Sequence, residues 1–139
     1  MRDDGSTQPC SNLGNYCGGT MNGIKNNLDY IQNMGFDAIW ITPPVDNTEG
    51  GYHGYWMRDL YTMNPRFGGN QALKDLSAEL HRRNMWLMVD VVANHVGPVG
   101  TDFSNIVQFN QNEHYHLPKC DISSSDFNNI NVYNLEHCW

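Results

Sequence analysis

Apolar residues recur at spacings of three and four along two stretches of the chain, which is the pattern of a helix with one buried face. Thr20 can cap the first stretch at its N-terminus and Gly35 can end it. Asn70 is the predicted N-cap of the second, and Arg82 and Arg83 suit the dipole at its C-terminus. We therefore predict two helices, with apolar faces made by Met21, Ile24, Leu28, Ile31 and Met34 and by Ala72, Leu73, Leu76 and Leu80.

Two continuous apolar runs, at residues 36–43 and 85–93, predict strands buried on both faces, as in parallel sheets. The glycine-rich stretch 45–69 between them reads as a long loop leading into the second helix. Strand, loop, helix and strand form a βαβ unit, whose strands pair in parallel. Residues 96–139 show no periodicity and are predicted to be irregular.

Polar residues mark the end of the second strand run. Asp90 interrupts the run and must be paired or hydrogen-bonded, because an isolated buried carboxylate is costly. If the strand continues, Asp90 and Asn94 share one face. The Asn94 oxygen suits a hard cation such as calcium, and His95 can donate to a sugar hydroxyl. The alternative is a polar cluster that only satisfies backbone groups.

The loop segment Tyr52-His53-Gly54-Tyr55-Trp56 lies on the same predicted rim as His95. Flat aromatic faces suit the C–H faces of sugar rings, and Gly54 permits a close backbone approach. The alternative is an aromatic loop core, but two histidine-bearing motifs on one rim favour a site. The alternating pair His114 and His116 could bind zinc, yet no partner spacing supports this.

The bulk composition narrows the function and the compartment. The net charge of −7 argues against nucleic acid and anionic membranes and suits a neutral substrate. No stretch is apolar enough to span a membrane, and no signal peptide is visible. The four cysteines favour disulfides over zinc and hence secretion. Three connectivities remain open, of which pairing between sequence neighbours is the simplest; reduced thiols in the cytosol are the alternative.

Several segments together resemble the fungal-type α-amylases of the α-amylase superfamily of glycoside hydrolases. The resemblance is co-linear over nearly the whole chain, and its most specific parts are the Tyr52–Trp56 loop and the run Val89–His95. The other matching pieces are residues 2–7, Cys17–Thr20, Leu28–Phe36, Ala38–Pro43 and Glu136–Trp139.

The resemblance implies an α/β fold of the (β/α)8 TIM-barrel type. A complete barrel needs about 250 residues. We therefore expect an N-terminal fragment in which residues 1–95 hold the second and third barrel strands with their helices. Residues 96–139 would begin the irregular, disulfide-bearing domain B that is inserted after the third strand.

The resemblance also implies site roles. Tyr55 would stack on the sugar beside the scissile bond with support from Trp56, and His53 and His95 would hydrogen-bond its hydroxyls. Asp90 would be a structural carboxylate near the catalytic centre. The metal ligands to Ca2+ would be the Asn94 side chain and the Glu136 backbone carbonyl. The disulfides would join Cys10 to Cys17 and Cys120 to Cys138.

The implied activity is retaining endo-hydrolysis of α-1,4-glucosidic bonds in starch, glycogen or maltooligosaccharides by a secreted monomer. Such chemistry needs two carboxylates, and no carboxylate here lies in a matching motif, so we expect no catalytic residue in this segment and no activity from it alone. The alternatives are an α-glucosidase or transglycosylase of the same superfamily, a non-catalytic amylase-like binding or transporter-subunit protein, and a small glucan-binding protein.

Overall fold

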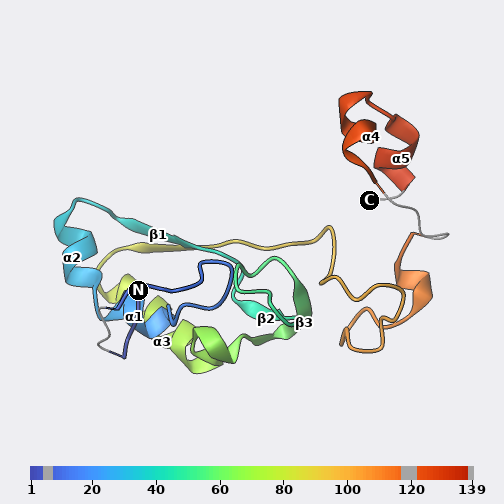
Figure 1. Ribbon diagram of the computed structural model, residues 1–139. Helices are drawn as coiled ribbons and strands as arrows, with labels where there is room; N and C mark the ends of the chain where they lie inside the picture. The colour runs from blue at the N-terminus through green and yellow to red at the C-terminus, as the bar shows by residue number, and fades with distance from the viewer. Residues whose placement is uncertain (5–7, 117–121, 138–139) are drawn as a thin grey trace.

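The computed structural model describes residues 1–4, 8–116 and 122–137. Strands β1 (Ala38–Ile41) and β4 (Trp86–Val89) form a parallel two-stranded sheet, with Ala38 opposite Trp86 and Ile41 opposite Val89. Helices α1 (Met21–Lys25) and α3 (Gly69–Arg82) lie along one side of it (Figure 1). The parallel pairing of the predicted βαβ unit is confirmed, and with it the α/β class.

The first predicted helix is two helices, α1 and α2 (Leu28–Asn33), so the prediction of one continuous helix is wrong. Thr20 does cap α1, because its hydroxyl oxygen accepts from the Gly23 N–H at 2.9 Å. The break follows from Asn27, whose side-chain amide donates to the Gly23 carbonyl at 2.7 Å and competes with the helical backbone. Gly35 follows α2 at φ +90°, as a helix-ending glycine does.

Helix α3 begins two residues earlier than predicted, and Asn70 is not its cap. The N-cap is Gly68 in the left-handed conformation, at φ 106°. The Asn70 side-chain Oδ1 instead accepts from the Met63 N–H at 2.9 Å, which ties the start of α3 to strand β3 (Met57–Met63). The predicted apolar face is confirmed, since Ala72, Leu76 and Leu80 are all buried.

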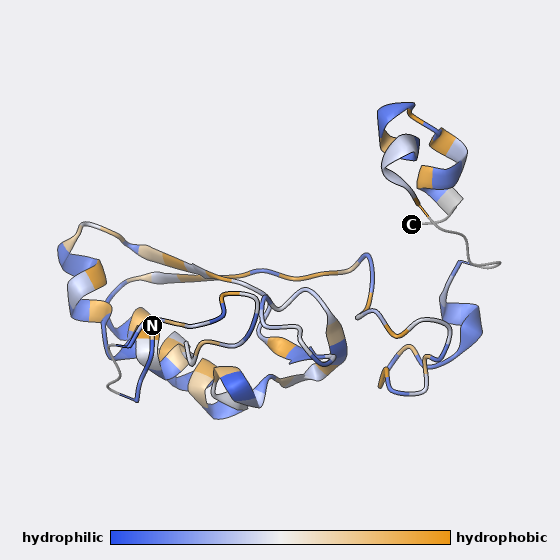
Figure 2. Cartoon of the chain, in the orientation of Figure 1, coloured by the Kyte–Doolittle hydropathy of each residue, from blue (hydrophilic) through white to orange (hydrophobic). Residues whose placement is uncertain are grey.

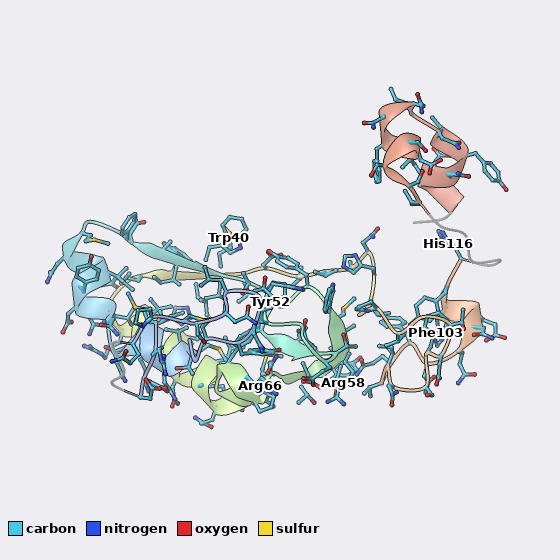
Figure 3. All side chains as sticks on the ribbon, viewed as in Figure 1. Trp40, Tyr52, Arg58, Arg66, Phe103 and His116 are labelled. Atoms are coloured by element: carbon cyan, nitrogen blue, oxygen red, sulfur yellow. A yellow bond between two sulfur atoms is a disulfide. The ribbon has the colours of Figure 1, made fainter. Side chains whose placement is uncertain are left out.

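The core lies between the helices and one face of the β1–β4 sheet. Leu28, Leu76 and Leu80 are fully buried there, and Ile39 and Leu87 of the strands pack against them. The prediction that both faces are buried is wrong: Trp40 and Trp86 are 71% and 72% exposed on the opposite face. Trp40 projects from β1 away from the helices (Figure 3), and apolar residues extend along both strands (Figure 2).

The stretch 45–69 is not a plain loop. It forms an antiparallel hairpin of β2 (Val45–Asn47) and β3, followed by the 3-10 helix η1 (Pro65–Phe67). The buried Asp46 accepts from the Arg58 guanidinium across the hairpin. The short strands are hard to recognise in the sequence for two reasons. Glycines and prolines recur through the stretch 45–69, and two of the three β2 residues are polar.

Residues 96–116 are irregular apart from the 3-10 helix η2 (Asn112–His114), as predicted. Beyond them, α4 (Ser124–Asn128) and α5 (Val132–His137) were not expected; they stand apart from the rest of the chain in Figure 1. Asp126 organises the pair, since it accepts from Ser123, Asn131 and Asn134. These bonds hold its pKa at about 2. The domain boundary at residue 95 stays a prediction.

The predicted disulfide between Cys10 and Cys17 is present, with the Cα atoms 5.5 Å apart. The second predicted pair, Cys120 and Cys138, lies outside the described residues. Among the helices that the structure describes, none has the length and apolar character needed to cross a membrane.

Candidate functional site

The candidate site lies where β1 and β4 end. Strand β4 stops at Val89, so the predicted continuation that would align Asp90 with Asn94 does not occur. The Asp90 N–H donates to the Ile41 carbonyl at 3.0 Å, which holds the two strand ends level. Asp90 therefore stands at the C-terminal edge of a parallel sheet, the edge where α/β barrels carry their functional residues.

Asp90 is paired with the aromatic loop, as a carboxylate in an apolar run requires. The Tyr55 hydroxyl donates to Asp90 Oδ2 at 2.7 Å. This bond to a carboxylate stabilises the protonated phenol and raises the pKa of Tyr55. The contact links residues 35 positions apart and brings the two predicted motifs together at one rim.

His53 shapes the same loop from within. Its Nδ1 accepts from the Tyr55 N–H at 3.0 Å, which places the ring proton on Nε2. The His53 ring stacks with Tyr55 at 5.8 Å between centroids and meets the edge of Trp56 at 4.8 Å. His53, Tyr55 and Trp56 thus pack together as one aromatic cluster. Within it, Tyr55 is 38% exposed to solvent.

His95 reaches this loop through the Tyr55 backbone. Its Nε2 lies 3.1 Å from the Tyr55 carbonyl oxygen, and because a carbonyl only accepts, Nε2 carries the proton. The Asn94 amide nitrogen then donates to His95 Nδ1 at 3.3 Å. In this structure His95 holds Tyr55 in place, and its predicted hydrogen bond to a sugar stays a proposal.

Two further residues build the loop. Gly54 has φ +91°, and a Cβ there would overlap the Pro43 carbonyl oxygen, so the close backbone approach predicted for Gly54 is confirmed. Asn47, buried in β2, accepts from the Trp56 N–H at 2.7 Å. Sequence reasoning missed Asn47, because its only signal is one polar residue in a stretch read as loop.

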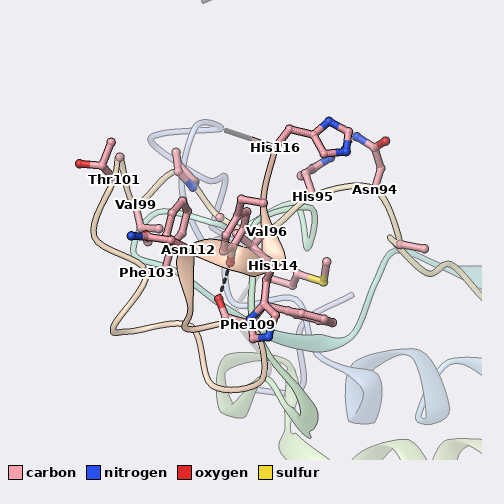
Figure 4. A pocket seen from close by; sticks show the side chains of 16 residues that line it. Asn94, His95, Val96, Val99, Thr101, Phe103, Phe109, Asn112, His114 and His116 are labelled. Carbon is pink, nitrogen blue, oxygen red and sulfur yellow. Dashed lines mark hydrogen bonds between the residues drawn. The ribbon is translucent and has the colours of Figure 1, made fainter. Parts of the chain in front are cut away.

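A cleft of about 770 Å³ opens beside the rim, and its lining includes Asn94, His95 and residues of the 97–116 segment. Phe103 and Tyr115 stack there with ring centroids 3.6 Å apart. Figure 4 shows His116 on the same side of the cleft as His95. The chain thus places imidazole, amide and aromatic groups around a space large enough for a small ligand.

The two predicted calcium ligands lie on separate elements of the chain. Asn94 offers one hard oxygen, whereas Ca2+ takes six to eight. Glu136 lies in α5, which stands apart from the rim in Figure 1. Within residues 1–4, 8–116 and 122–137, no three histidine, cysteine or acidic side chains cluster as a metal site. The calcium site stays a prediction.

Comparisons with known proteins match this chain to one family. The family model described as "Alpha amylase, catalytic domain" matches residues 2–139. Alpha-amylase 2 of Schwanniomyces occidentalis is 49% identical over 150 residues, covering 99% of this chain and 29% of that protein. Alpha-amylase mde5 of Schizosaccharomyces pombe is 50% identical over 133 residues, covering 89% of this chain and 25% of that protein.

A solved structure supports the same assignment. The alpha-amylase from Malbranchea cinnamomea superimposes with a TM-score of 0.84 at 43% identity, over 99% of this chain and 30% of that chain. The chain spans between a quarter and a third of the length of the relatives it matches. From the family match over nearly all its residues, this chain belongs to the α-amylase family of glycoside hydrolases.

Proposed function

We propose that the protein carrying this chain is a retaining endo-hydrolase of α-1,4-glucans such as starch and glycogen, and that this chain supplies part of its substrate-binding rim. The observation that carries the proposal is the Tyr55–Asp90 bond, which joins the aromatic loop to the carboxyl edge of the β1–β4 sheet. The named relatives are alpha-amylases, which supports the activity.

The aromatic and imidazole side chains have distinct parts in this proposal. Tyr55 stacks on a glucose ring in this proposal. Its ring is held by the hydroxyl bond to Asp90 and the stacking contact with His53, and its backbone is held by His53 and His95. Trp56 supports it through the edge contact with His53. The Nε2–H of His53 is a donor suited to a sugar hydroxyl. Retaining hydrolysis also needs a nucleophile and an acid/base carboxylate, and we assign neither to this chain.

The exposed sheet face fits a partial (β/α)8 barrel. Ile39 and Leu87 face the helices, whereas Trp40 and Trp86 lie on the opposite face of the sheet. In a barrel, the residues on the face away from the helices line the interior. In this proposal β1 and β4 are neighbouring barrel strands, the second and third in chain order. Residues 96–139 then begin the inserted domain B.

Calcium and secretion belong to the same proposal. Asn94 and the Glu136 carbonyl would each give an oxygen ligand, and bound calcium would fasten the inserted segment to the rim. The Cys10–Cys17 disulfide fits an oxidising, extracellular compartment. Chelation with EDTA should lower the unfolding temperature of the protein, and calcium, but not magnesium, should restore it. An unfolding temperature that EDTA leaves unchanged would exclude the metal.

A tyrosine pair tests the glucan site. Tyr55→Ala removes the stacking ring, whereas Tyr61→Ala removes a tyrosine that is 81% exposed on β3. We expect Tyr55→Ala to weaken maltoheptaose binding by about tenfold, as loss of a stacked ring does, and Tyr61→Ala to leave it within twofold. Equal effects of the two variants would refute the site. Glucan binding without hydrolysis would favour the non-catalytic alternative.

A further inference from the structure

Strand β3 has an open edge that the irregular 97–116 segment covers. One edge of β3 pairs with β2. At the other edge, the Val107 N–H donates to the Arg58 carbonyl at 3.0 Å. An open strand edge leaves backbone groups to be satisfied, so a segment without regular structure takes the place of a neighbouring strand here.

The Gln108 side chain makes the most specific contact along this edge. Its Oε1 accepts from the Leu60 N–H at 3.0 Å, as the carbonyl of a neighbouring strand would. Its Nε2 donates to Asp59 Oδ1 at 2.7 Å. One amide therefore binds a backbone donor and a carboxylate acceptor on two successive residues of β3, and both partners lie 48 or 49 residues away in sequence.

The same segment forms the outer wall of the cleft beside His95. Ile106, 1% exposed, anchors it two residues before Gln108. Immediately after Gln108, the Phe109 carbonyl accepts from the Tyr115 hydroxyl at 2.5 Å, and Tyr115 stacks on Phe103. Gln108 thus sits between the buried anchor and the aromatic wall, and a shift of Gln108 would move Phe109 and Tyr115.

We infer that Gln108 is a positioning residue whose clamp on Asp59 and Leu60 of β3 holds the cleft wall opposite His95 and thereby sets the affinity for glucan. The inference rests on the proposed function, because it takes the cleft as part of the glucan path. Asp59 has its pKa lowered chiefly by the Gln108 hydrogen bond, in keeping with a tight contact to the carboxylate. The substitution Gln108→Glu would keep an acceptor for the Leu60 N–H and place a second carboxylate against Asp59.

The test compares Gln108→Glu with Gln108→Met, which has similar length and no charge. Asn105→Asp is the control for added charge in the same segment, because Asn105 is exposed and does not line the cleft. Three quantities are measured on the purified protein that carries this chain: hydrogen exchange over residues 98–116, and KM and kcat with soluble starch.

We expect both Gln108 variants to speed exchange in this segment by about tenfold, as loss of a charge-assisted hydrogen bond does. KM should rise about fivefold with kcat within twofold, while Asn105→Asp matches the unsubstituted protein. Unchanged exchange in Gln108→Met, or a fall in kcat at constant KM, would overturn the inference. If the unsubstituted protein neither binds nor cleaves starch, the proposed function fails, and the link between Gln108 and glucan affinity fails with it. The hydrogen-exchange measurement would still test whether Gln108 holds the segment on β3.

Discussion

Substitution of Gly54 by alanine should cost stability through backbone strain and through a steric collision, and comparison with Gly35 separates the two. Gly54 and Gly35 have nearly the same left-handed backbone, with φ of +91° and +90°. A Cβ at Gly35 would meet nothing within 4 Å, whereas a Cβ at Gly54 would overlap the Pro43 carbonyl oxygen and lie 3.2 Å from the Pro43 Cδ. The two alanine variants therefore share the backbone strain, and only Gly54→Ala adds the collision.

The magnitudes follow from these two terms. A left-handed alanine costs about 1–2 kcal/mol, which is the full effect expected of Gly35→Ala. Forcing a methyl group into a packed position adds about 1–3 kcal/mol, so Gly54→Ala should lose about 2–5 kcal/mol of unfolding free energy. Because Gly54 lies between His53 and Tyr55, we also expect its variant, and not Gly35→Ala, to weaken glucan binding.

Urea unfolding followed by tryptophan fluorescence gives the free-energy losses, and maltoheptaose titration gives the affinities. Equal losses of stability in the two variants would refute the reasoning, because the collision with Pro43 would then cost nothing. A Gly54→Ala protein that is destabilised but binds maltoheptaose normally would show that the loop conformation is not needed for binding.

Two further predictions concern stability. Leu76→Ala should lower the free energy of unfolding by about 2–5 kcal/mol, because Leu76 is fully buried in the core. Leu13 is 78% exposed, so Leu13→Ala should change it by no more than about 0.5 kcal/mol in urea unfolding. A small loss for Leu76→Ala would contradict the core assignment. Hydrogen bonds from Arg82 and Arg83 hold the pKa of Glu79 at about 2, below its ordinary 4.5. Because this pKa is depressed, its contribution to stability is present above pH 4.5 and is lost as pH falls toward 2. Glu79→Gln should therefore lower the unfolding midpoint at pH 7, and the difference should vanish near pH 2; a difference independent of pH would exclude the ion pairs.

Elements with local causes could be read from the sequence. The apolar face of α3 follows from helical spacing, and the Thr20 cap and the Gly35 stop each need only their own neighbours. A close approach at Gly54 was also predictable, because glycine lets other atoms come near the backbone, but its partner Pro43 was not. The parallel pairing of β1 and β4 followed from the order of the elements.

The sequence by itself thus determined the βαβ order, the motifs at the strand ends and the family. The tertiary structure alone decided which atoms meet: Tyr55 with Asp90, Asn47 with the Trp56 backbone, and Gln108 with Asp59. The physical reason is that periodicity and capping act over one helical turn. Hydrogen bonds between residues 9 to 49 positions apart depend instead on how the hairpin and the sheet edge are placed in space.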